Sequence, residues 1–324
     1  MPRVAGRLTA HDLGLVINTA DPYSVEVGAA YVRARRLAPA QVLRVELPVR
    51  PTLAPDELQH LRERIDAHFG PATQALALAW TMPYAVDCNS ITGALALGFD
   101  AALCRQPCAP SRRSAYFNSA SSRPYADAGF RPSMLLAAPD VAAAKALIAR
   151  GFAADRTLGL RGAPPANAWF VATSDAARSV RSRLFPPPGH AARLGLDVHV
   201  EHAEAIGDAA RVMLYLTGAT RVEKLDRVGW LPGALADNLT SFGGALDGHA
   251  GQMTALAWIG AGATASYGSV SEPCSHLQKF PHPQLLLLHY AQGATAIEAY
   301  WKSVAWPQQG LFVGEPLAAP FARR

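Results

Sequence analysis

The stretch LGLVINTADPYSVEVGAAYVRARRLAPAQVLRVEL, residues 13–47, decides the fold. It begins with an apolar run over 13–18 and ends with another over 42–47, and both runs predict buried strands. Between them, Asp21 can cap a helix whose first position is Pro22. The apolar residues that we place on one face of this helix are Val25, Ala29 and Val32. A strand, a helix and a second strand in this order predict two parallel strands with a right-handed crossover.

The same alternation continues along the chain. An amphipathic helix is predicted after Pro55 and Asp56, and another after Asp140. Further buried strands are predicted at 74–80, 133–138, 168–173, 196–201 and 210–218, and in GATASYGSV and GLFVGEP near the C-terminal end. Apolar strands that alternate with helices predict an α/β fold, with a mostly parallel sheet sandwiched between helices.

Two segments interrupt the alternation. The loop 100–132 is long for a compact domain and combines arginines with tyrosines, so it could close over a pocket as a lid or pack as a solvated loop. The segment GLRGAPPANA, residues 159–168, is interpreted as a hinge between two similar halves, 1–158 and 159–324. The aromatic and basic residues of the loop are Tyr116, Phe117, Tyr125, Arg112, Arg113, Arg123 and Arg131.

Composition excludes several classes of protein. The 324 residues are 17% charged, with a formal net charge of +5, and the arginines are scattered rather than clustered, so we expect no nucleic-acid partner. No apolar run approaches the roughly 20 residues of a membrane-spanning helix. The opening residues show no signal peptide, so the chain as written is expected to be cytoplasmic, or exported if its start is truncated.

The four cysteines leave several interpretations open. Cys104 and Cys108 lie close together in CRQPCAP, which permits free thiols or a disulfide in an exported protein. Their spacing is wider than that of a typical zinc-binding pair, and no second matching pair follows. We therefore expect neither a metal ion nor a cofactor.

Polar residues follow three predicted strands of the second half. Thr217 and Gly218 end one strand, Asp237 ends another, and Glu272 follows a third. In an open α/β sheet, ligands collect at the carboxyl ends of strands, so these residues predict a polar pocket. Four residues of the turn after Asp237 complete the predicted ligand-binding set: Thr240, Ser241, Gly243 and Gly244. The alternative is that the polar residues cap turns and the glycines permit unusual backbone angles.

The sequence offers weak candidates for a nucleophile. Ser241 lies in TSFGG, which is not the Gly-x-Ser-x-Gly motif of serine hydrolases, and His249 is the only nearby base. Cys274 and His276 are close in sequence but lie in an irregular, proline-rich loop. The residue types therefore permit catalysis without indicating it.

Several stretches together resemble an uncharacterised bacterial family found in organisms that carry the exosortase protein-sorting system. They cover nearly the whole chain and include the stretch 15–48, RPSMLLAAPD, GALADNLTSFGG, GATASYGSVSEPC, KFPHPQLLLLHYAQGATAIEAYWKSV and LFVGEPLAAPF. The resemblance implies no known activity. It does imply a cell-envelope or protein-sorting context, because members of that family commonly look exported.

Residues 209–316 are more distantly similar to the gingipain-type, caspase-like cysteine peptidases. In those enzymes one strand ends in a His-Gly pair and the next ends in the nucleophilic cysteine. Here the first position reads Thr217-Gly218 and the second falls in Ala236-Asp237-Asn238. The resemblance therefore implies two caspase-like halves without the catalytic pair, because a carboxylate at Asp237 lacks the imidazole that would make a thiolate.

These observations favour a protein that is not a peptidase and that binds a small ligand or a protein segment at the carboxyl ends of its strands. The alternative is a hydrolase with relocated groups, in which Cys274 or Ser241 is the nucleophile and His249 or His276 is the base. A third hypothesis is a scaffold of cell-envelope assembly that uses surfaces rather than a pocket.

Overall fold

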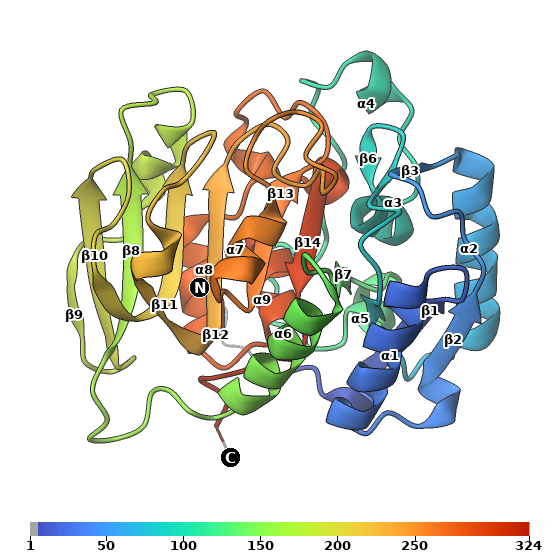
Figure 1. Ribbon diagram of the computed structural model, residues 1–324, viewed down its shortest axis with the longest axis horizontal. Helices are drawn as coiled ribbons and strands as arrows, with labels where there is room; N and C mark the ends of the chain where they lie inside the picture. The colour runs from blue at the N-terminus through green and yellow to red at the C-terminus, as the bar shows by residue number, and fades with distance from the viewer. Residues whose placement is uncertain (1–5, 324) are drawn as a thin grey trace.

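The computed structural model describes residues 6–323 and forms an α/β fold (Figure 1). The long strands are β1 (Leu13–Asn18), β2 (Val42–Val45), β4 (Ala75–Leu78), β7 (Ser133–Leu135), β8 (Ala166–Ala172), β10 (Leu196–His202), β11 (Ala209–Gly218), β12 (Val228–Leu239), β13 (Ala265–Ser269) and β14 (Gly310–Gly314). The helices are α1 (Pro22–Arg35), α2 (Pro55–His68), α3 (Ile91–Leu97), α4 (Ala102–Arg105), α5 (Pro124–Ala128), α6 (Val141–Ala154), α7 (Ala255–Ala261), α8 (Pro283–Ala291) and α9 (Ala296–Ser303).

One sheet of 11 strands runs through both halves of the chain in the order β2-β1-β4-β7-β14-β13-β12-β11-β8-β10-β9, where β9 is the short edge strand Gly189–Ala191. Neighbouring strands are parallel within the block from β2 to β7 and within the block from β13 to β10. Strand β14 is antiparallel to β13, and β9 is antiparallel to β10. The mostly parallel sheet predicted from the apolar strands is confirmed.

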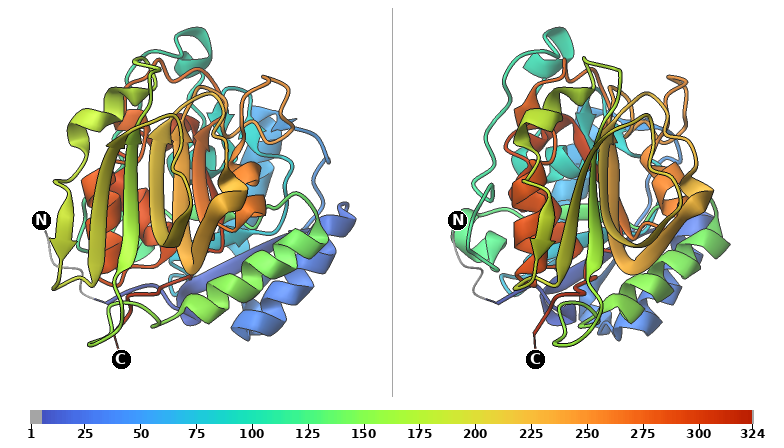
Figure 2. Two further views of the ribbon diagram at one scale, coloured as in Figure 1. Left: turned by 60° about the vertical axis from the view of Figure 1, so that its left-hand side comes forward. Right: turned by 90° about the vertical axis from the view of Figure 1, so that its left-hand side faces the viewer.

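Helices cover both faces of this sheet, as the two turned views of Figure 2 show. Helices α1, α6 and α7 pack together on one face. On the other face α9 and α3 contact β14, α8 packs on α9, and α2 packs between β2 and α3. A second sheet of three very short strands, β3 (Thr52–Leu53), β5 (Ala85–Val86) and β6 (Asn89–Ser90), lies beside α3.

The predicted helix starts are confirmed in the structure. Asp21 accepts a hydrogen bond from the amide of Tyr23, and Asp140 accepts one from Ala143, so each carboxylate caps its helix. The face predicted for α1 is wrong, because Val25 is 46% exposed. The helix instead buries Gly28 against Ile17, where a Cβ would clash. It also buries Tyr31 and Arg35, whose side chains bind the buried carboxylate of Glu315.

The two blocks of the sheet are joined where their strands end. The hydroxyl of Ser271, just after β13, donates to the carbonyl of Cys88, which lies in the turn between β5 and β6. Cys108 and Cys274 form a disulfide across the same region, and Cys88 pairs with Cys104. The open question of a Cys104–Cys108 bond is therefore answered: both residues are oxidised, but each has a different partner.

The arginine- and tyrosine-rich loop 100–132 packs along α9. The amide of Asn118 donates to the carbonyl of Lys302 at the end of α9, and Tyr116 is buried. Arg131 is also buried, where it donates to the carbonyls of Phe69 and Thr73. The proposed lid is therefore not supported, because residues that would have to move belong to the interior.

No helix within residues 6–323 is both long and apolar enough to cross a membrane. The first five residues of the opening stretch, in which no signal peptide was recognised, lie outside the described residues.

Candidate binding site

The structure brings the ends of β11 and β12 together as the sequence predicts. Thr217 of β11 pairs in register with Asn238 of β12, and Leu216 pairs with Asp237. Thr217 is 1% exposed and Asp237 is fully buried. Thr217 and Asp237 therefore both lie in the protein interior, on neighbouring strands but one residue out of register with each other.

An arginine that the sequence did not single out joins these strand ends. Arg181, from the 3₁₀-helix η3 (Ser179–Leu184), lies with its Nη1 2.6 Å from the Oδ1 of Asp237. Its Nη2 donates to the carbonyl of Thr217 at 2.7 Å. The side chains of Arg181 and Asp237 are only 2% and 1% exposed, so this is a buried ion pair.

Burial dominates the electrostatics of this pair. It raises the pKa of the Asp237 carboxyl above its ordinary value, and the nearby guanidinium of Arg181 acts in the opposite direction. Removing one partner of a buried ion pair leaves an uncompensated charge in a medium of low polarity. Asp237 therefore stabilises Arg181 and is not poised as a nucleophile toward solvent.

Gly218 and Gly244 hold the strand ends tightly packed. A Cβ on Gly218 would overlap the carbonyl oxygen of Arg178, and one on Gly244 would overlap the carbonyl oxygen of Gly268. The amide of Gly244 donates to the carbonyl of Ser269 at 2.8 Å. These glycines are thus required for close backbone approach, and the amide of Gly244 is used within the fold.

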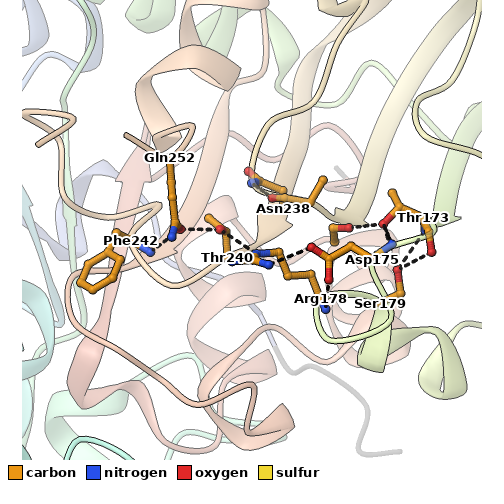
Figure 3. A network of polar contacts seen from close by, with 10 residues as sticks. Thr173, Asp175, Arg178, Ser179, Asn238, Thr240, Phe242 and Gln252 are labelled. Atoms are coloured by element: carbon orange, nitrogen blue, oxygen red, sulfur yellow. Dashed lines mark hydrogen bonds and ion pairs between the residues drawn. The ribbon is translucent and has the colours of Figure 1, made fainter. Parts of the chain in front are cut away.

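A polar network that we call the rim lies just beyond the ends of β8 and β12 and consists of Thr173, Asp175, Arg178, Thr240 and Gln252 (Figure 3). The Nη1 of Arg178 lies 2.8 Å from the Oδ2 of Asp175, and its Nε donates to the hydroxyl of Thr240 at 3.3 Å. That hydroxyl donates in turn to the Oε1 of Gln252 at 2.5 Å. The rim thus links the segments that follow β8 and β12.

The rim is partly open to solvent. Thr173 and Thr240 are buried, whereas Asp175, Arg178 and Gln252 are half-buried. Partial burial raises the pKa of Asp175, but hydrogen bonds and the charge of Arg178 outweigh it and hold the pKa below its ordinary value. Asp175 is therefore charged at neutral pH, and its ion pair with Arg178 fixes the orientation of both side chains.

The remaining predicted site residues lie in the loops that follow β12 and β13. Ser241 is half-buried, and its carbonyl accepts from Ser269, while within residues 6–323 its hydroxyl has no hydrogen bond to an imidazole. Gly243 is buried, and its carbonyl accepts from the amide of Ala255. Glu272 lies in the loop after β13, where its carboxylate accepts from the amide of Cys274 at 2.7 Å.

The candidate catalytic groups are separated. The sulfur of Cys274 is bonded to Cys108, so this residue offers no thiol. His249 is exposed, and its Nδ1 lies 2.7 Å from the Oδ1 of Asp247. The ring of His276 lies against Trp306, with centroids 6.0 Å apart. Among the described residues, no cluster of His, Cys, Asp and Glu could hold a metal ion.

Neither the protein-family models nor the curated proteins contain a match to this chain. The functional argument therefore depends on the site itself.

Proposed function

We propose that this protein is a non-peptidase of caspase-like architecture that binds a ligand or a protein segment over the rim. The observation that carries the proposal is the buried Arg181–Asp237 ion pair, which fills the strand ends with charges that satisfy each other. Because these two charges satisfy each other, the strand ends offer no free group for nucleophilic attack. The rim nevertheless presents polar groups in fixed orientations.

The rim supplies the groups that a binding surface requires. Arg178 offers guanidinium donors, and Asp175 offers carboxylate acceptors next to them, with its Oδ2 2.8 Å from the Nη1 of Arg178. Ser241 and Gln252 add half-buried polar groups from the loop after β12. Because the internal hydrogen bonds of Arg178 fix its orientation, binding costs little side-chain entropy. The resemblance to a family of exosortase-carrying organisms favours a cell-envelope or protein-sorting context for this partner.

A peptide library displayed on phage, selected against the full chain, tests the proposal. Selected peptides should bind wild-type protein and lose about tenfold or more in affinity to Arg178→Ala, since a charge-assisted hydrogen bond contributes roughly 1.5–3 kcal/mol. Arg33→Ala is the matched control, because Arg33 is exposed on the distant helix α1. Calorimetry gives the affinities, and peptides that bind Arg178→Ala as tightly as wild type would contradict the proposal.

A hydrolase remains the competing function, and one observation favours it. Asp247 and His249 form a pair in the same loop as Ser241, and the ring of His249 lies 6.4 Å from that of Phe242. A fluorophosphonate probe distinguishes the two functions. The binding proposal predicts no labelling, whereas labelling that disappears in both Ser241→Ala and His249→Ala would establish a serine hydrolase.

A further inference from the structure

A cavity of about 600 Å³ lies at the edge of the sheet opposite the rim. Part of its lining, 158–161, comes just before β8, and Arg193 with Leu194 comes just before β10. The last described residues of the chain form another wall. Figure 2 shows the linker before β8 and the C-terminal segment side by side at this lower edge. A second cavity of about 350 Å³ adjoins it and shares 159–161 and Arg193. We refer to both together as the arginine cavity.

The charges that line the arginine cavity are unbalanced. Arg156, Arg161, Arg193 and Arg323 line it, and none of them has an ion pair or side-chain hydrogen bond with any residue in 6–323. Asp155 is the acidic residue of the larger cavity, but its Oδ2 lies 2.7 Å from the Nη1 of Arg35. The other oxygen of Asp155 accepts from the amide of Ala319. The carboxylate is thus neutralised by groups outside the cavity, and the arginines keep a net positive charge.

The arginine cavity also has an apolar wall. Leu158, Leu194 and Phe321 line it, and Phe321 belongs to the hydrophobic core. Leu160 is 57% exposed, one of four large apolar side chains that are exposed among the described residues. An exposed leucine beside several arginines is a combination that a purely structural linker does not require.

The linker that forms the cavity is held at both ends. The amide of Arg156 donates to the carbonyl of Ala319, and the amide of Leu158 donates to the carbonyl of Pro320. At the other end the guanidinium of Arg211 donates to the carbonyls of Pro164 and Pro165. Between these anchors, Gly159 has a φ of +69°, a conformation that favours glycine. The fold therefore fixes both ends of the segment that lines the cavity.

We propose that the arginine cavity binds an organic anion. Its carboxylate or phosphate group binds Arg161 and Arg193, which line both parts of the cavity, and its apolar body packs against Leu160 and Phe321. Guanidinium groups match the geometry of carboxylate and phosphate oxygens through paired hydrogen bonds. This site is independent of the rim, which lies at the opposite edge of the sheet.

Fluorescence titration with 8-anilinonaphthalene-1-sulfonate, an anion on an aromatic body, tests the proposal on the full chain. Arg161→Ala combined with Arg193→Ala should weaken binding at least about tenfold, and Leu160→Ser about threefold. Arg33→Ala is the matched control and should stay within about twofold. Circular dichroism confirms that each variant is folded. Equal affinity of the double variant and wild type would overturn the proposal.

Competition separates the two parts of the proposed ligand. Decanoate, which carries a carboxylate and an alkyl chain, should displace the probe at a much lower concentration than inorganic phosphate. Equal displacement by both anions would overturn the apolar part of the proposal.

Vesicles then distinguish the source of the anion. If the ligand is a lipid headgroup, the protein should cosediment with vesicles of phosphatidylcholine and phosphatidylglycerol in equal amounts. This cosedimentation should be lost with vesicles of phosphatidylcholine alone and in the double variant. Probe binding without cosedimentation assigns a soluble organic anion.

Discussion

The two edges of the sheet in the second half treat their arginines in opposite ways. At the carboxyl edge, Arg181 is buried and paired with Asp237, and Arg178 is tied to Asp175. At the amino edge, Arg161 and Arg193 are exposed and have no ionic partner among the described residues. The residue type is the same, so the difference lies in what surrounds it.

This difference distinguishes a charge that is paired within the fold from a charge that can pair with a ligand. A buried arginine must be paired, because transfer of an isolated charge from water to a protein interior costs several kcal/mol. An exposed arginine has no such requirement and can pair with a ligand at little desolvation cost. Full burial with an ionic partner thus marks Arg181 as an arginine that holds the fold, whereas exposure without a partner among the described residues leaves Arg161 and Arg193 available to a ligand.

The largest effect on stability is expected when the buried ion pair at the carboxyl edge is broken. Asp237→Ala leaves the guanidinium of Arg181 buried without its partner, and should lower the free energy of unfolding by about 3–5 kcal/mol. Equilibrium unfolding in urea measures this change.

A double substitution provides the control for that experiment. Arg181→Met with Asp237→Leu removes both charges and should restore stability to within about 2 kcal/mol of wild type. A double variant as unstable as Asp237→Ala would show that shape, and not the unpaired charge, accounts for the loss.

The structure of the carboxyl edge could be predicted from the sequence only in part. The apolar strands, the helix caps and the adjacency of the ends of β11 and β12 all follow from local patterns and from the alternation of strands with helices. Arg181 was missed because its partner lies 56 residues away in sequence. The pairing of Cys108 with Cys274 spans 166 residues and is equally invisible to local patterns.

Helix α1 shows why hydrophobic spacing can mislead. Its buried face contains Gly28, Tyr31 and Arg35, which are chosen by close packing and by the carboxylate of Glu315. Val25 looks like a core residue but lies on the exposed side. The buried face of this helix depends on contacts with residues at the far end of the chain. Local patterns in a single sequence do not predict those contacts.

A smaller effect is expected from Lys279, which is buried at the carboxyl edge and donates to the carbonyl of Pro107 at 2.5 Å. Burial lowers the pKa of its ammonium group to about 8 from the ordinary value of 10.5. Between pH 8 and 10.5 the unfolded chain binds more protons at this residue, so its contribution to stability rises with pH across that window.

Comparison with Lys279→Met isolates this contribution from other groups that titrate in alkali. The stability difference, wild type minus variant, should increase by at most about 3 kcal/mol from pH 8 to 10.5. Urea unfolding at a series of pH values measures it. A difference that stays constant or falls over this range would contradict the expected titration.

The smallest effect is expected at the amino edge, and it completes the comparison. Arg161→Ala with Arg193→Ala removes two guanidinium groups that have no ionic partner among residues 6–323, so the free energy of unfolding should change by no more than about 0.5 kcal/mol. Removal of like charges around one cavity can even stabilise the protein slightly, because their mutual repulsion disappears. A loss of more than about 1 kcal/mol in urea would place these arginines in the same structural class as Arg181. The argument for an anion would then lose its basis, since it requires that the positive charge of this edge is left unused by the fold.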